Sequence, residues 1–140
     1  MKILFICKYN RFRSKVAEKY FERVNKNPRI KIKTAGIIEV NRSLDVAEKK
    51  RNIYLKKTFG FVLEAKSVSI NVRSLLWADK IIVVADDVPK KLFDSKKWKD
   101  KVEVWKVQDE EADDKRNINK IVKAIMKKVD LLNKKLKDNK

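Results

Sequence analysis

Short apolar runs alternate with amphipathic segments along the whole chain. The segment 2–6 contains an apolar run with the length and the β-branched and aromatic content of a buried strand. Apolar residues then recur at helical spacing from Val16 to Val24, which predicts a helix over about 14–25. The remaining pattern predicts, in order, a strand over 30–35, a basic helical segment over 43–58, a loop over 61–73 followed by a short helix, a strand over 80–85, a short helix near 89–93 and a strand over 102–107.

A final helix is predicted from about Asp114 onward, with its apolar residues on one face. These residues are Ile118, Ile121, Val122, Ile125, Met126, Val129, Leu132 and Leu136. Strands that alternate with helices predict an α/β fold, here a single-domain four-stranded parallel sheet with helices on both faces. In the expected strand order, 2-1-3-4, the connections of strands one and three leave in opposite directions. Ligands collect at such a switch point, which is the carboxyl end of strand one.

Cys7 directly follows the first predicted strand, and Arg13 and Ser14 stand where the first helix begins. A helix start has unpaired N–H groups and the positive end of the helix dipole, so it favours an anion such as phosphate. These surroundings also favour a thiolate, which makes Cys7 a candidate nucleophile. The guanidinium of Arg13 can hold two phosphoryl oxygens at once. The segment 7–14, called the phosphate loop below, is therefore predicted to cradle a phosphate beside a nucleophile.

Other residues of this loop have more than one possible use. Ser14 could donate a hydrogen bond to the sulfur or cap the first helical turn, and both uses fit the geometry. Asn10 tolerates a left-handed backbone and can hydrogen-bond within a tight loop. Tyr9 and Phe12 could border the phosphate pocket and contact a phenyl ring of a ligand. The three tryptophans are expected to pack in the core rather than to stack on a substrate; they are Trp77, Trp98 and Trp105.

The spacing of Cys7, Asn10, Arg13 and Ser14 after a strand near the N-terminus resembles that of the low-molecular-weight protein tyrosine phosphatases and their arsenate-reductase relatives. Three further segments are similar to parts of that family, and they are 34–36, 77–84 and 104–109. The resemblance extends over the whole chain. It implies a single low-molecular-weight phosphatase-like domain over residues 1–140.

This resemblance implies a cysteine-dependent protein tyrosine phosphatase or phosphomonoesterase that forms a cysteinyl-phosphate intermediate. By position, Cys7 would attack phosphorus, Arg13 would hold the developing charge and Asp109 would protonate the leaving oxygen. Asp113 and Asp114 are alternatives as the acid, or caps of the last helix. The implied phosphate-binding residues are Lys8, Tyr9, Asn10, Arg11, Phe12, Arg13 and Ser14. No metal or cofactor is required, and the expected partner is a phosphorylated substrate, either a phosphotyrosine protein or a small aryl phosphate.

The chain departs from the family pattern in and after the loop. Tyr9 stands where glycine is usual, and a bulky residue would resist any positive φ that the loop requires. Glu110 and Glu111 follow Asp109 in place of proline and aromatic residues, and two acidic groups would repel a dianionic substrate. These departures favour an alternative, a phosphate-binding module of the same fold with little turnover. Phe12 stands where some members have a second cysteine, which disfavours a thiol-relay arsenate reductase.

Composition limits the remaining possibilities. The 140 residues, 44% of them hydrophobic, suit one domain with one core. A single cysteine permits no internal disulfide, and the absence of histidine excludes Cys–His catalysis and histidine–metal sites. No apolar run approaches the length of a membrane span, and the N-terminus enters the first strand without a signal-peptide pattern. We therefore expect a cytoplasmic protein that does not bind membranes.

The formal net charge of +18 raises nucleic-acid binding as a rival function. Lysines are spread along almost the whole chain and are mixed with aspartate and glutamate. This distribution is typical of a solvated basic surface. No dedicated nucleic-acid site is expected, because no sequence motif of a nucleic-acid reader is present.

Overall fold

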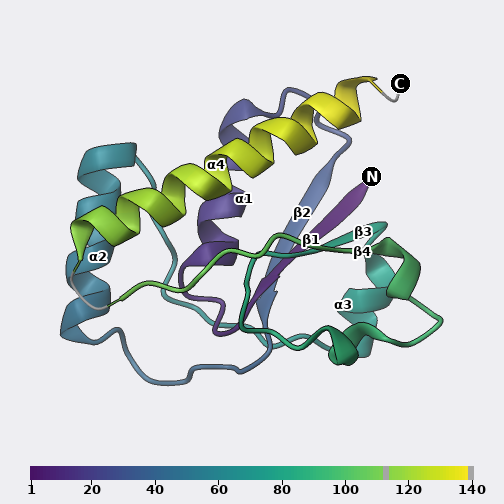
Figure 1. Ribbon diagram of the computed structural model, residues 1–140, viewed down its shortest axis with the longest axis horizontal. Helices are drawn as coiled ribbons and strands as arrows, with labels where there is room; N and C mark the ends of the chain where they lie inside the picture. Colours follow the sequence, from purple (N-terminus) through teal and green to yellow (C-terminus); the bar gives the residue numbers. More distant parts are fainter. Residues whose placement is uncertain (112–113, 139–140) are drawn as a thin grey trace.

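The computed structural model describes residues 1–111 and 114–138 and has a four-stranded parallel sheet as its centre (Figure 1). The strands are β1 (Lys2–Cys7), β2 (Lys31–Gly36), β3 (Lys80–Val83) and β4 (Val102–Val104). The helices are α1 (Arg13–Val24), α2 (Val46–Phe59), α3 (Val72–Trp77) and α4 (Lys115–Asp138), with two 3-10 turns, η1 (Lys90–Phe93) and η2 (Lys99–Lys101). The strand order is β2-β1-β3-β4, as predicted.

The central strand β1 is buried on both faces. Ile3 and Phe5 belong to a core cluster with residues of α1 and α4, whereas Leu4 and Ile6 belong to a cluster with α3. A parallel strand covered by helices on both sides has no polar face, and this explains the continuous apolar run in its sequence. The switch point predicted from the strand order therefore lies at the end of β1, where Cys7 is the last residue.

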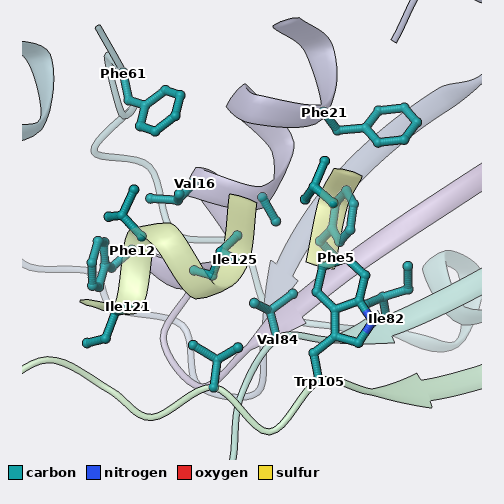
Figure 2. Close-up of a cluster of buried hydrophobic side chains, with 14 of the residues drawn as sticks. Phe5, Phe12, Val16, Phe21, Phe61, Ile82, Val84, Trp105, Ile121 and Ile125 are labelled. Atoms are coloured by element: carbon teal, nitrogen blue, oxygen red, sulfur yellow. The ribbon is translucent and has the colours of Figure 1, made fainter. Parts of the chain in front are cut away.

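The larger core cluster lies between the sheet and the helices α1 and α4 (Figure 2). Phe5 packs against Phe21 and Trp105, with ring centroids 6.3 and 5.9 Å apart. The apolar face predicted for the last helix is confirmed, since six of its eight residues are buried and Met126 and Leu136 pack at its edge. All three tryptophans belong to the two core clusters or pack against them, as expected.

Helix α2 begins at Val46, later than the predicted segment 43–58. The reason is local. The Asp45 side chain accepts a hydrogen bond from the Glu48 backbone N–H, and the Glu48 side chain accepts one from the Asp45 N–H, which is a reciprocal cap. The helix ends at Phe59 and is capped by Gly60, whose φ of 76° is left-handed.

Strand β4 ends at Val104, although the pattern predicts a strand to residue 107. Trp105 still donates its N–H to the Val83 carbonyl, but the Val107 N–H turns back to the Trp105 carbonyl. The Val107 carbonyl then accepts from the Asp86 N–H and from Arg13. The chain therefore leaves the sheet at residue 105 and crosses the edge where β1 ends.

No helix in the ranges 1–111 and 114–138 is long and apolar enough to cross a membrane.

Candidate active site

Cys7 lies at the carboxyl end of β1, buried to 2% exposure, and faces the start of α1. Its Sγ donates a hydrogen bond to Ser14 Oγ at 3.1 Å. Helix α1 begins at Arg13, and its N-cap residue, Phe12, makes no side-chain capping bond. Of the two uses considered for Ser14, the contact with the sulfur is therefore the one that the structure has.

Asn10 gives the phosphate loop its curvature. Its φ of 54° is left-handed, the only such value at a non-glycine residue among the described parts of the chain. The Asn10 Nδ2 donates to Ser14 Oγ at 3.0 Å, and its Oδ1 accepts from the Val68 N–H at 3.0 Å. Because the positive φ falls on Asn10, the predicted conflict at Tyr9 does not arise. The prediction that Asn10 takes a left-handed backbone and hydrogen-bonds within the loop is confirmed.

Gly36, the last residue of β2, allows the loop to approach the sheet. A Cβ at this position would lie 2.8 Å from the Asn10 N and 2.9 Å from the Tyr9 carbonyl carbon. Real Cβ atoms do not come this close to backbone, so only glycine fits without a shift of the loop. Ser67 also holds the phosphate loop, since its Oγ donates to the Tyr9 carbonyl at 2.9 Å.

Arg13 is 2% exposed and reaches across the edge of the sheet. Its Nη1 donates to the Val107 carbonyl at 2.9 Å, and its Nη2 lies 3.0 Å from an Asp87 carboxylate oxygen. Asp109 and Asp86 lie further away, at 3.6 and 3.9 Å from the guanidinium. Sequence reasoning did not select Asp86 and Asp87. Their place after a parallel strand was a usable signal, because the carboxyl ends of such strands share one edge.

A cavity of about 300 Å³ opens beside Cys7. Its lining includes Arg13 and Asp109, and in the phosphate loop Tyr9, Arg11 and Phe12. The geometry thus brings the predicted nucleophile, arginine and acid to one cavity, although Asp109 is about a hundred positions from Cys7 in the sequence.

The other two candidates for the acid stand differently. Asp114 is exposed, and its Oδ1 accepts from the backbone N–H groups of Arg116 and Asn117 at 3.0 and 3.3 Å. It therefore caps the start of α4. Asp113 lies outside the described residues.

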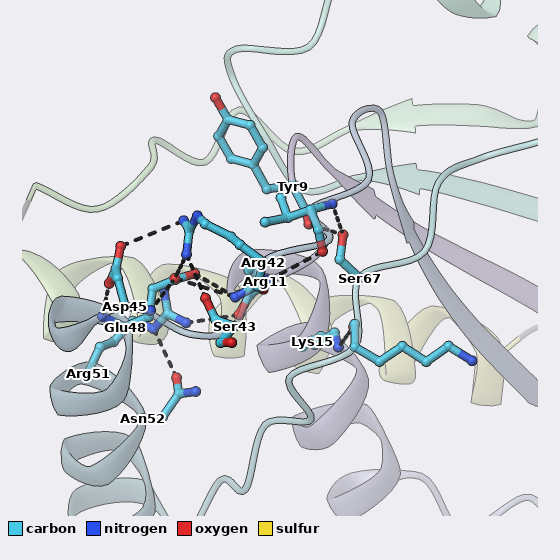
Figure 3. A network of polar contacts seen from close by, with 12 residues as sticks. Tyr9, Arg11, Lys15, Arg42, Ser43, Asp45, Glu48, Arg51, Asn52 and Ser67 are labelled. Atoms are coloured by element: carbon cyan, nitrogen blue, oxygen red, sulfur yellow. Dashed lines mark hydrogen bonds and ion pairs between the residues drawn. The ribbon is translucent and has the colours of Figure 1, made fainter.

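Charged residues line part of the cavity, and several of them belong to the network of polar contacts in Figure 3. Arg11 pairs with Glu48 at 3.3 Å, and Arg42 pairs with the same carboxylate at 2.5 Å. Burial acts to raise the pKa of Glu48, but the hydrogen bonds and charges of its partners hold it below the ordinary value. Also in the lining of the cavity, Arg51 forms an ion pair with Glu110. Neither Arg51 nor Glu48 carried a signal in the sequence, since each stands in a helix rich in charged residues.

In the comparison with protein families, residues 2–140 match the model described as low molecular weight phosphotyrosine protein phosphatase. The chain belongs to this family. It is therefore a protein-tyrosine-phosphatase-like hydrolase of phosphoric monoesters. The search among curated proteins found no match.

Solved structures share the fold of this phosphatase at low sequence identity. The low molecular weight phosphotyrosine phosphatase VcLMWPTP-2 from Vibrio cholerae O395 has a TM-score of 0.82 and 14% identity, covering 99% of this chain and 98% of its own. A protein tyrosine phosphatase from Entamoeba histolytica gives 0.79 and 20%, with coverages of 100% and 97%. The YwlE arginine phosphatase from Geobacillus stearothermophilus gives 0.77 and 21%, with coverages of 99% and 94%.

Proposed function

We propose that this phosphatase is a cysteine-dependent protein tyrosine phosphatase or phosphomonoesterase that works through a cysteinyl-phosphate intermediate. One observation carries the proposal: the Cys7 thiol, bonded to Ser14 at the start of α1, opens to the same cavity as Arg13 and Asp109. A nucleophile, an anion-binding helix start and a carboxyl group are the groups that such a reaction needs.

The reaction has two steps. In the first, Cys7 has lost its proton to solvent, and its thiolate sulfur forms a bond to phosphorus while the bond from phosphorus to the ester oxygen breaks. The protonated Asp109 gives that oxygen its proton. In the second, Asp109 accepts a proton from water as the water oxygen attacks phosphorus, and the sulfur leaves. Arg13 and the N–H groups of residues 8–14 hold the phosphoryl oxygens in both steps. Inorganic phosphate, the Cys7 thiolate and the protonated Asp109 result, and no metal or cofactor takes part.

The proposed substrate is a phosphotyrosine protein or a small aryl phosphate. Tyr9 is 38% exposed at the cavity and offers its ring to a phenyl group, whereas Phe12 is 3% exposed and is largely part of the core. The single-domain organisation over residues 1–140 and the cytoplasmic location stay predictions.

The alternative is a phosphate-binding module with little turnover. It is favoured by the contacts of Arg13, whose guanidinium is engaged by Asp87 and by the Val107 carbonyl. A phosphoryl group must compete with these acceptors for the same donors. Such competition weakens the stabilisation of charge in the transition state.

Hydrolysis of phenyl phosphate and p-nitrophenyl phosphate by the purified protein tests both proposals. We expect Cys7→Ser to abolish turnover of both esters and Arg13→Ala to lower both alike. Asp109→Asn should lower turnover of phenyl phosphate by about 10²–10⁴-fold, and that of p-nitrophenyl phosphate far less, because nitrophenolate leaves without a proton. Asp114→Asn, which alters a helix cap, is the control and should leave the ratio of the two rates unchanged.

Two outcomes would contradict the enzyme. If the wild type hydrolyses neither ester while phosphate still protects Cys7 from iodoacetamide, the binding module is the better description. If neither turnover nor protection is found, both proposals fail.

A further inference from the structure

Arg51, on helix α2, contacts the phosphate loop at two consecutive residues. Its side chain is only 3% exposed. The Nη2 donates to the Arg11 carbonyl at 3.0 Å, and the guanidinium carbon lies 4.9 Å from the centre of the Phe12 ring. Its Nε donates to Asn52 Oδ1 at 3.0 Å, which fixes the plane of the guanidinium (Figure 3).

The same guanidinium reaches the loop that holds Asp109. The Nη1 of Arg51 forms an ion pair with Glu110, whose side chain is 21% exposed and lines the cavity. Glu110 in turn donates its backbone N–H to Asp109 Oδ1 at 2.8 Å. The buried side chain of Arg51 therefore connects the phosphate loop to Glu110, and Glu110 is hydrogen-bonded to the proposed acid, Asp109.

We propose that Arg51 is a positioning residue that holds Asp109 over the phosphate loop by its ion pair with Glu110. This inference rests on the proposed function, since it assigns a support to the proposed acid. It also explains Glu110, which stands where the family pattern has proline. Arg51 offsets the negative charge of Glu110 at the cavity and holds the loop that contains Asp109 and Glu110 in position.

The pair is better suited to setting a position than to stabilising the fold. Burial raises the pKa of Glu110 above its ordinary value, Asp109 and Glu48 act in the same direction, and Arg51 lowers it only in part. The ionised pair is thus disfavoured by its surroundings, as is common for buried ion pairs. A lysine cannot replace the arginine, because a single ammonium lacks the planar fork that meets Arg11, Asn52 and Glu110 together.

Two variants test the proposal with the same pair of esters. Glu110→Gln keeps the shape of the side chain and removes its charge, and Arg51→Lys keeps the charge and removes the fork. Both should lower turnover of phenyl phosphate by about tenfold to a hundredfold, as misplaced catalytic groups do. Turnover of p-nitrophenyl phosphate should stay within about twofold, because it depends little on the acid. The double variant should be no worse than the more damaging single one, since both break one connection.

Two control variants each remove one exposed charge next to the proposed pair. Glu111→Gln changes the exposed neighbour of Glu110, and Lys50→Ala changes the exposed neighbour of Arg51. Both should keep the wild-type ratio of the two rates. Protection of Cys7 from iodoacetamide by inorganic phosphate should be unchanged in Glu110→Gln, which shows that the phosphate loop is intact.

Each contrary result has a distinct meaning. In one case, Asp109→Asn lowers turnover of phenyl phosphate more than that of p-nitrophenyl phosphate, but Glu110→Gln and Arg51→Lys leave the ratio of the two rates at its wild-type value. The positioning role of Arg51 is then overturned, and the proposed function stands. If Asp109→Asn itself shows no dependence, the acid assignment fails and the positioning role falls with it. Should Arg51→Lys not fold, Glu110→Gln alone decides between these outcomes.

Discussion

The residue types in and next to the phosphate loop are explained by backbone conformation and close packing as well as by their proposed roles in the reaction. Asn10 adopts a left-handed backbone, and its side chain is hydrogen-bonded to Ser14 and to the Val68 N–H. The Asn10 amide therefore both shapes the loop and orients the Ser14 hydroxyl next to Cys7. Gly36 provides the space that the turn requires. Tyr9 can occupy a position where the family usually has glycine, because the strained conformation is taken by its neighbour.

Replacement of Gly36 by alanine tests this account. The new Cβ would meet the backbone at Asn10, which cannot rotate away, so we expect a loss of about 1–3 kcal/mol in the free energy of unfolding. Turnover and phosphate protection of Cys7 should fall as well, because the loop must shift. Urea unfolding and the two-ester assay measure these effects.

Gly60→Ala is the matched control. Gly60 has a left-handed φ, so alanine should cost about 1 kcal/mol there through backbone strain, but it ends α2 and does not line the cavity. Turnover should be retained in the folded variant. Equal loss of activity in both variants would show that Gly36 acts only through stability.

Helix α1 begins with a polar buried turn at the place where we propose that an anion binds. It has no acidic residue in its first turn, so the positive end of its dipole is not offset there. Arg13, Ser14 and Lys15 are all buried in that turn, and Lys15 donates to the carbonyls of Glu64 and Lys66. The first turn thus serves the phosphate loop, and the apolar packing comes from later residues such as Phe21.

Glu18 lies one turn further along α1 and predicts a pH dependence of stability. Burial, with Glu22 and Glu64, raises the pKa of Glu18 above its ordinary value of 4.5. The folded state therefore favours the protonated form, and this contribution to stability is complete below pH 4.5 and is lost as the pH rises through the raised pKa. Glu18→Gln should be more stable than the wild type at pH 7, and the difference should shrink toward pH 4.

Urea unfolding of both proteins at the two pH values measures this difference. Glu39→Gln, at an exposed loop position, removes the same charge and controls for the larger net positive charge. A Glu18→Gln variant that is less stable than wild type at pH 7, or whose difference does not change with pH, would contradict the account.

At the scale of the whole molecule, the formal net charge is +18, and the lining of the cavity includes Arg11, Arg13, Arg42 and Arg51. Along α4 the exposed positions are mostly lysines, among them Lys120, Lys123, Lys127 and Lys134. Such a field raises the local concentration of anions without selecting one of them. We therefore expect the surface to steer phosphorylated ligands toward the molecule, and any selection among them to come from the proposed site.

This account predicts weak, unselective binding of nucleic acid. Titrations of duplex and single-stranded oligonucleotides over a salt series should show an affinity that falls linearly on a log–log plot, without sequence preference. Cys7→Ser should bind them as the wild type does, because the cavity is not involved. Tight, sequence-selective binding at physiological salt would instead support a dedicated nucleic-acid site.

The sequence by itself determined the order of the elements, the topology of the sheet and the place of Cys7 at the end of β1. These features depend on local periodicity and on general rules of chain connection, both of which are visible in a single sequence. The curvature at Asn10 also followed from a local preference. The ends of the strands and helices were less well determined by the sequence. The end of β4, for example, depends on the Val107 carbonyl, which accepts hydrogen bonds from Arg13 and from the Asp86 N–H.

Only the tertiary structure decided how the site is completed. Arg13 meets Asp87 across 74 positions of sequence, and Arg51 meets Glu110 across 59. An arginine on a basic helix has the same local pattern whether it is solvated or buried against a loop, so no periodicity distinguishes Arg51 from its neighbours. The space that Gly36 leaves for Asn10 likewise exists only when β2 and the phosphate loop lie side by side. Such contacts arise from the packing of distant segments, which the order of residues along the chain does not display.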